Sequence, residues 1–89
     1  MTRLHLTVTG RVQGVGYRWF VRQLAEKLGV SGWVRNREDG SVEAEAEGSP
    51  GALDELVARL KTDNPAARVD SVALVPVPPK GDTGFRIAV

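Results

Sequence analysis

Residues 41–47, which read Ser-Val-Glu-Ala-Glu-Ala-Glu, alternate apolar and acidic side chains more regularly than any other part of the chain. Side chains along a strand point alternately to the two faces of a sheet. The pattern therefore predicts a strand that buries Val42, Ala44 and Ala46 and turns three glutamates to solvent. Because the buried alanines are small, we expect a helix to pack close over this strand. The chain must then build a sheet with one covered face and one solvated face.

Hydrophobic periodicity locates the remaining elements. Strict alternation predicts strands, and apolar residues at spacings of three and four predict amphipathic helices. The predicted strands cover residues 3–8, 30–36, 41–47, 69–77 and 85–89, and the predicted helices cover residues 17–28 and 50–63. Alternation is least regular in residues 69–77, where a bulge is expected. We expect Tyr17 and Phe20 in the core, and Trp33 in the core or at its edge.

The ends of these elements carry their own signals. Gly29 follows the first helix at the position where a left-handed residue closes a helix. Ser49 and Pro50 open the second helix as N-cap and first-turn residue. Between the second and third strands, Asp39-Gly40 is typical of a tight hairpin and predicts positive φ angles there.

The order β-α-β-β-α-β with a short terminal strand predicts an α+β fold class. Two β-α-β units with right-handed crossovers interleave most simply as an antiparallel sheet with both helices on one face, the ferredoxin-like split arrangement. At 89 residues, the chain is expected to form a single domain over residues 1–89. In this topology the loop after the first strand lies near the end of the second strand, which brings Arg18 toward Asn36.

The composition indicates the cellular compartment of the protein and the charge of its ligand. The chain has no cysteine, which excludes disulfides and thiolate metal sites, and its apolar runs are too short to span a membrane. No charged-then-apolar leader precedes the first strand, so we expect a cytoplasmic protein. The net charge is +1, yet residues 1–37 hold seven Lys and Arg against Glu26 alone, whereas residues 38–89 hold five basic and ten acidic residues. The first of these parts is therefore expected to attract an anion.

Residues 10–18, Gly-Arg-Val-Gln-Gly-Val-Gly-Tyr-Arg, connect the first strand to the first helix. Glycines allow backbone N–H groups to approach a ligand, and the free N–H groups of the helix start point at the same place. The guanidinium of Arg18 adds a fixed charge and a planar pair of donors suited to phosphate or carboxylate. The alternative is an ordinary tight turn, because the spacing matches neither a P-loop nor a dinucleotide-binding loop.

Few residue types are available for acid, base or nucleophile chemistry. The chain has a single histidine, His5, on the polar side of its strand, and no histidines or carboxylates at metal-ligand spacing. The serines have no base at a recognisable motif distance. A reaction in this chain should therefore need little acid–base help. Phosphoryl transfer to water from a good leaving group meets this condition, because positioning and charge stabilisation supply most of its catalysis.

The residues resemble one family in two blocks. Residues 10–18 match the acylphosphatase signature G-x-V-Q-G-V-x-[FY]-R at each specified position, and Gly-Trp-Val-Arg-Asn at 32–36, followed by Asp39-Gly40, resembles the family's second block. The resemblance implies metal-independent hydrolysis of acyl phosphates without a cofactor, on a ferredoxin-like fold. It further implies that Asn36 orients the attacking water. The phosphate would be held by the Arg18 guanidinium and by the backbone N–H groups of Gln13, Gly14, Val15, Gly16, Tyr17 and Arg18.

Two other functions use the same architecture. A binding module is one, since this fold also serves RNA-recognition and small-ligand regulatory domains. The acidic strand at 41–47 would repel RNA phosphates, so we expect no nucleic-acid partner, but a regulatory anion sensor stays open. The other is action on carbamoyl phosphate, which resemblance to the amino-terminal domain of a hydrogenase-maturation protein suggests. We expect a monomer that takes a small acyl phosphate.

Overall fold

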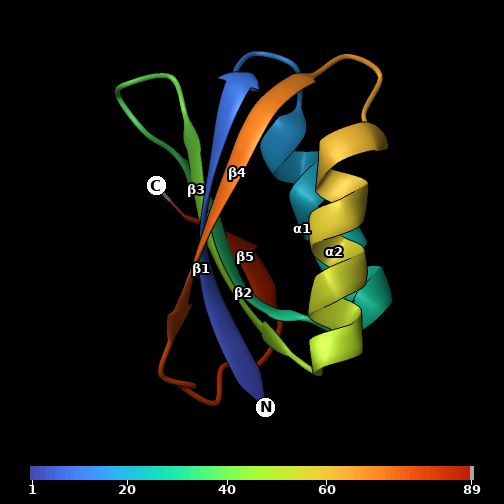
Figure 1. Cartoon of the computed structure of the whole chain (residues 1–89), viewed down its shortest axis with the longest axis vertical. Coiled ribbons are helices and arrows are strands. Elements are labelled where there is room, and N and C mark those ends of the chain that lie inside the picture. Colours follow the sequence, from blue (N-terminus) through green and yellow to red (C-terminus); the bar gives the residue numbers. More distant parts are fainter. Residues whose placement is uncertain (89) are drawn as a thin grey trace.

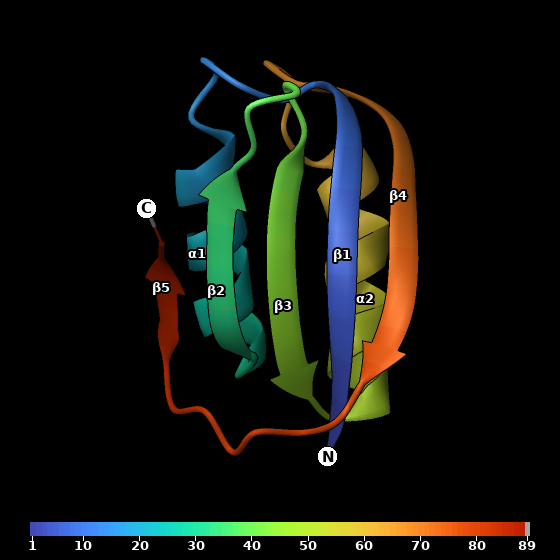
Figure 2. The same cartoon turned by 90° about the vertical axis from the view of Figure 1, so that its left-hand side faces the viewer.

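The computed structural model describes residues 1–88, which form a five-stranded sheet with two helices packed on one of its faces (Figure 1). The strands lie in the order β4-β1-β3-β2-β5 (Figure 2). The elements are β1 (Thr2–Arg11), α1 (Tyr17–Leu28), β2 (Ser31–Asn36), β3 (Val42–Gly48), α2 (Pro50–Thr62), β4 (Arg68–Val77) and β5 (Phe85–Ile87). The predicted element order and ferredoxin-like arrangement are confirmed. Val89, the end of the predicted last strand, lies outside the described residues.

The terminal strand β5 joins the sheet in a different direction from the others. β1 pairs antiparallel with β3 and β4, and β2 pairs antiparallel with β3. β5 runs parallel to β2, with Phe85 opposite Gly32 and Ile87 opposite Val34. The chain reaches this edge because residues 78–84 cross from β4 over one end of the sheet (Figure 2). The expected antiparallel sheet therefore has a parallel addition, which places Ile87 beside β2.

The core lies between the helices and the inner face of the sheet. Val42, Ala44 and Ala46 of β3 are at most 3% exposed, so the alternation predicted their burial correctly. Tyr17, at the start of α1, belongs to the same buried core, and its ring lies 5.5 Å from that of Phe20. The helices close the core with the apolar side chains Val21, Leu24, Ala25, Leu53, Leu56 and Leu60.

The end of α1 and the start of α2 agree with the sequence signals at Gly29 and Ser49. Gly29 has a φ of 70° after α1, and its N–H donates to the last turn of that helix. Ser49 caps α2, its side-chain oxygen accepting a hydrogen bond from the Ala52 N–H at 3.3 Å. No helix between residues 1 and 88 has the length and apolar character needed to cross a membrane.

The bulge expected in β4 is present. Thr9 pairs with Ser71 and Gly10 pairs with Val69, so one residue of β4 has no partner on β1. At Gly10 a Cβ atom would lie 2.1 Å from the carbonyl oxygen of Arg68. The first glycine of the 10–18 stretch is therefore required by close strand packing at the bulge.

The β2–β3 hairpin differs from the predicted turn. Gly40 has a φ of 92°, but no residue other than glycine has a positive φ among residues 1–88, so the prediction for Asp39 is wrong. The reason is that the connection is longer than two residues. The Gly40 N–H bonds back to the Arg37 carbonyl at 3.3 Å, a turn that needs a left-handed residue only at its end. The Asp39 carboxylate instead accepts hydrogen bonds from the Ser41 N–H and hydroxyl at 3.0 and 2.6 Å.

The outer face of the sheet is not the solvated surface that the alternation predicted. Glu47 is 3% exposed and Arg3 is 1% exposed. The Arg3 Nε lies 2.7 Å from Glu45, and its Nη1 lies 3.2 Å from Glu47 and 2.9 Å from Asp82. These groups are buried because residues 78–84 cross this end of the sheet, a long-range contact that strand periodicity does not encode.

Trp33 and His5 lie on the same outer face. The expectation that Trp33 lies in the core or at its edge is wrong, because its neighbours Gly32 and Val34 are turned toward the helices and Trp33 is turned to the outer face. The guanidinium of Arg35 lies 5.7 Å from the Trp33 ring, which leaves the ring half-buried. His5 is half-buried on this face, as expected for the polar side of its strand, with its Nε2 2.7 Å from a carboxylate oxygen of Glu43.

We expect Glu47 to make the stability of the fold depend on pH. Its carboxylate accepts hydrogen bonds from the Lys80 and Gly81 N–H groups at 2.7 and 2.9 Å, and with the charge of Arg3 these contacts hold the pKa of Glu47 below its ordinary value. A depressed pKa stabilises the fold above the ordinary glutamate value of about 4.3, and this stabilisation is lost as the pH falls below it.

Glu47→Gln should therefore lower the melting temperature by several degrees at pH 7 and flatten its fall between about pH 5 and 2. The matched control is Glu55→Gln on the exposed surface of α2, which should keep the wild-type profile. Thermal melts of all three proteins across this range give the comparison. Identical pH profiles for Glu47→Gln and the wild type would show that the buried carboxylate does not hold the 78–84 connection.

Candidate active site

The loop before α1 presents open space and free N–H groups. Gly14 and Gly16 have φ angles of 77° and 73°, in the left-handed region that glycine tolerates best. A Cβ atom built on either residue would meet no other atom within 4 Å. Gly16 is the N-cap of α1, and no side chain within residues 1–88 caps this helix start. The first-turn N–H groups and the positive end of the helix dipole are therefore available to an anion.

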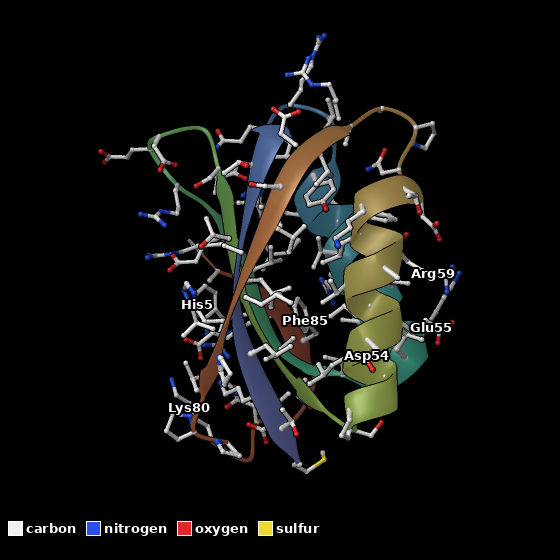
Figure 3. The ribbon with its side chains drawn as sticks, in the orientation of Figure 1. His5, Asp54, Glu55, Arg59, Lys80 and Phe85 are labelled. Carbon is white, nitrogen blue, oxygen red and sulfur yellow. The ribbon has the colours of Figure 1, made fainter. Side chains whose placement is uncertain are left out.

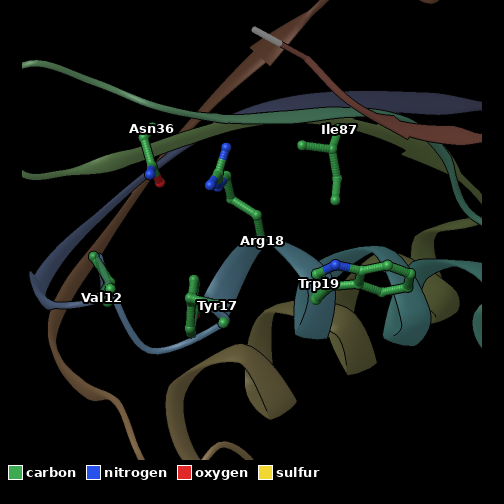
Figure 4. A pocket seen from close by; sticks show the side chains of 8 residues that line it. Val12, Tyr17, Arg18, Trp19, Asn36 and Ile87 are labelled. Atoms are coloured by element: carbon green, nitrogen blue, oxygen red, sulfur yellow. The ribbon is translucent and has the colours of Figure 1, made fainter.

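Arg18 lies one residue inside the helix start and directs its side chain toward the sheet. Its guanidinium ends between Asn36 and Ile87 (Figure 4). The side chain is exposed, and no carboxylate in the described part of the chain forms an ion pair with it. Its N–H donors are thus free to bind the phosphate or carboxylate group of a ligand.

Asn36 reaches the same place from β2. Alternation along this strand turns Gly32, Val34 and Asn36 toward the helices, and Asn36 is the last residue of the strand. Its side-chain amide is half-buried and points toward the Arg18 guanidinium (Figure 4). Two residues 18 positions apart in sequence therefore line one cavity, where the topology predicted proximity.

A cavity of about 310 Å³ lies between these groups. Its lining combines residues of the loop, the first turn of α1 and the ends of β2 and β5, namely Val12, Gly14, Gly16, Tyr17, Arg18, Trp19, Asn36 and Ile87. Five of the residues predicted for the site are among them. The predicted residues Gln13 and Val15 are not part of this lining.

Gln13 uses its side chain to join two loops. Its Nε2 donates to the carbonyl oxygens of Arg37 and Ser41 at 2.7 and 2.9 Å. These carbonyls belong to the hairpin that follows Asn36. Gln13 therefore fixes the glycine loop against the segment that carries Asn36, which is a positioning contact.

Tyr17 contributes a buried anchor. Its hydroxyl donates to the carbonyl oxygen of Leu60 at 2.8 Å, and burial raises its pKa above the ordinary value. The phenol is therefore neutral, and its hydroxyl proton is already donated to α2. Tyr17 lines the cavity at the first residue of α1 and anchors this end of the helix, from which Arg18 projects.

Three residues of the lining were not predicted for the site. Trp19 is 59% exposed and lies outside the apolar stripe of α1. A large aromatic residue on the polar side of a helix was visible in the sequence and could have indicated a site residue. Val12 lies in the family motif but is nearly fully buried, with a side chain that serves the core. Ile87 could not be placed beforehand, because its position depends on the parallel pairing of β5 with β2.

Among residues 1–88, Arg18 is the only lining residue of the cavity with a charged side chain. Asn36 adds a neutral amide that can both donate and accept. Among residues 1–88 no group of three His, Cys, Asp or Glu side chains is placed to hold a metal ion. The site therefore combines a fixed positive charge, N–H donors and one amide, a set suited to binding an anion and orienting a neutral molecule beside it.

Comparison with known proteins gives one consistent result. A family model described as Acylphosphatase matches residues 4–87. A protein named acylphosphatase from Thermococcus kodakarensis is 47% identical over 85 residues, which cover 96% of this chain and 93% of that protein.

Solved structures agree with this match. The crystal structure of acylphosphatase from Bacillus subtilis has a TM-score of 0.97 at 39% identity, with 100% of both chains covered. A second likeness, to HypF of T. kodakarensis, has a TM-score of 0.88 at 32% identity and covers all of this chain but 12% of HypF.

Proposed function

Because the chain belongs to the acylphosphatase family and hydrolyses acyl phosphates to a carboxylate and inorganic phosphate, we propose that its active site is the cavity at Arg18 and Asn36. The single observation that carries this assignment is the geometry. The guanidinium of Arg18 and the amide of Asn36 come from separate elements and line one cavity with the open glycine loop.

The phosphate group is held by the loop and by Arg18. Backbone N–H groups of residues 13–18 surround the phosphate oxygens, and the Arg18 guanidinium binds two of them as a planar fork. Negative charge is spread over the equatorial oxygens in the transition state of phosphoryl transfer. Fixed donors aimed at these oxygens lower the barrier without reorganising during the reaction.

Asn36 orients the water. Its amide oxygen accepts a hydrogen bond from the water and its amide nitrogen can donate to a phosphate oxygen, which places the water in line with the bond that breaks. The water oxygen forms the new bond to phosphorus, and the acyl carboxylate leaves with the electron pair of the old bond. The released proton passes to solvent.

No general acid, metal or cofactor is required by this mechanism. A carboxylate is a good leaving group without protonation, and the positive charge that a metal would supply comes from Arg18 and the helix start. Because no histidine or carboxylate side chain of residues 1–88 lines the cavity, turnover should be nearly constant from about pH 5 to 9.

The test is release of inorganic phosphate from benzoyl phosphate by the full chain in excess chelator. We expect saturable turnover that is unchanged by the chelator. Saturable binding of phosphate without turnover would instead support an anion sensor. A parallel assay with carbamoyl phosphate separates the two substrate classes, and we expect benzoyl phosphate to be the better substrate.

We propose that residues 1–89 act as one domain and as a monomer in the cytoplasm, where a cysteine-free chain loses nothing under reducing conditions. Carboxylates populate the outer face of the sheet, and RNA-recognition domains of the same architecture bind RNA through their sheet. A nucleic-acid partner is therefore not proposed.

A further inference from the structure

The cavity has a polar side and an apolar side. Asn36 lies on one side of the Arg18 guanidinium, and Ile87 and Trp19 lie on the other (Figure 4). The mechanism assigns the polar side to phosphate and water. The apolar side has no role in it.

Trp19 is held in place although it is exposed. Residues two apart on a helix are about 200° apart around its axis, so Trp19 points away from the core residue Tyr17. The guanidinium of Arg22, one turn further along, lies 5.5 Å from the centroid of the Trp19 ring, within the range of a cation–π contact. Arg22 is itself paired with Glu26 at 3.3 Å. The ring is thereby supported from the side of the helix and keeps an open surface toward the cavity.

Ile87 faces Trp19 from the sheet. It lies opposite Val34 in the parallel β2–β5 pair, and the next N–H, that of Ala88, donates to the Val34 carbonyl at 2.8 Å. Val34 is fully buried beneath the helices, so Ile87 shares the helix-facing side of the sheet. Its side chain is half-buried and completes the cavity wall across from α1.

We propose that Trp19 and Ile87 form the acyl subsite and give the enzyme a preference for acyl phosphates with flat, apolar acyl groups. This inference rests on the proposed function. In-line displacement puts the attacking water and the leaving oxygen on opposite sides of phosphorus. With the water at Asn36 and the phosphate at Arg18, the leaving acyl group is directed to the opposite side, where Trp19 and Ile87 lie. An aromatic acyl group packs there against an indole face and a branched aliphatic side chain.

The test compares benzoyl phosphate with acetyl phosphate, which share the reacting bond and differ in the size of the acyl group. Trp19→Ala should lower kcat/KM for benzoyl phosphate about tenfold and leave that for acetyl phosphate within about twofold. Ile87→Ala should act in the same direction with about a threefold loss. Trp19→Phe should restore most of the benzoyl phosphate activity, because a ring is again present. Trp33→Phe, on the outer face of the sheet, is the matched control and should behave as the wild type.

Equal losses for the two substrates, or no loss for either, would overturn the acyl subsite. The acetyl phosphate activity of each variant also reports that it has folded. If the proposed function itself were wrong, the wild-type protein would hydrolyse neither substrate, so the two outcomes are distinguishable.

Tryptophan fluorescence gives a second readout that does not depend on turnover. Trp19 and Trp33 are the two tryptophans of the chain, so Trp33→Phe leaves Trp19 as the sole reporter. Phenacylphosphonate, an inert analogue of benzoyl phosphate, should change the Trp19 emission, whereas acetonylphosphonate should leave it nearly unchanged. The same change with both analogues would show that the emission follows phosphate binding, and would contradict contact between Trp19 and the acyl group.

Discussion

Arg18→Ala should lower kcat/KM for benzoyl phosphate by about a thousandfold, which corresponds to about 4 kcal/mol of transition-state stabilisation. In the described part of the chain, the guanidinium is the only charged side chain that lines the cavity, so its loss leaves the transferring phosphoryl group with neutral donors alone. Affinity for phosphate should fall as well, because Arg18 contacts the group in both ground and transition states. Steady-state kinetics and inhibition by inorganic phosphate measure the two effects.

Two further variants test whether the loss in Arg18→Ala is due to the missing guanidinium or only to the change in net charge. Arg68→Ala removes the same charge from exposed edge strand β4, where its partner is the surface residue Asp70, and should retain wild-type turnover. Arg18→Lys keeps the charge but loses the planar pair of donors, and should recover only a small part of the activity. Turnover of Arg18→Ala equal to that of the wild type would remove Arg18 from the mechanism.

Asn36→Ala should lower kcat by about a hundredfold while the inhibition constant of phosphate stays within about twofold. The split is expected because Asn36 positions the water, whereas the loop and Arg18 hold the phosphate. The side chain is at the end of β2 and does not belong to the hydrophobic core, so the fold should persist. Kinetics with benzoyl phosphate and phosphate inhibition on the same preparation give both quantities.

The other asparagine of the chain supplies the matched control. Asn64 accepts a hydrogen bond from the Ala66 N–H in the connection between α2 and β4, and Asn64→Ala should keep wild-type kcat. Asn36→Asp retains acceptors for the water but adds a negative charge beside the phosphate, so KM should rise. If Asn36→Ala weakens phosphate binding as strongly as it lowers kcat, Asn36 holds the phosphate and not the water.

Local sequence signals were enough to predict the order of the elements, the end of α1 and the start of α2, but β1 runs three residues beyond its predicted end at Val8. Gly29 closes α1 and Ser49 opens α2 through contacts within one helical turn, which sequence spacing describes directly. The meeting of Arg18 and Asn36 was predictable for a different reason. Once two β-α-β units are interleaved, few topologies remain, and in the simplest one these positions share an edge.

The features that could not be predicted depend on a single long-range crossing. Residues 78–84 cover one end of the outer face, so Glu47 is buried where alternation predicts a solvated glutamate. The same crossing delivers β5 to the edge of β2, which places Ile87 in the cavity wall. The contacts of the Gln13 side chain with the hairpin also join segments whose spacing in sequence gives no indication of contact.

The central claim is that water attacks phosphorus while the phosphate is held by the loop and Arg18. Hydrolysis of benzoyl phosphate by the wild-type protein in water labelled with oxygen-18, with excess chelator present, tests it most directly. Mass analysis of both products shows which bond has broken. We predict that the label appears in inorganic phosphate and that the benzoate stays unlabelled. Label in the benzoate would mean that water attacks the acyl carbon, and would contradict the roles proposed for Arg18 and Asn36.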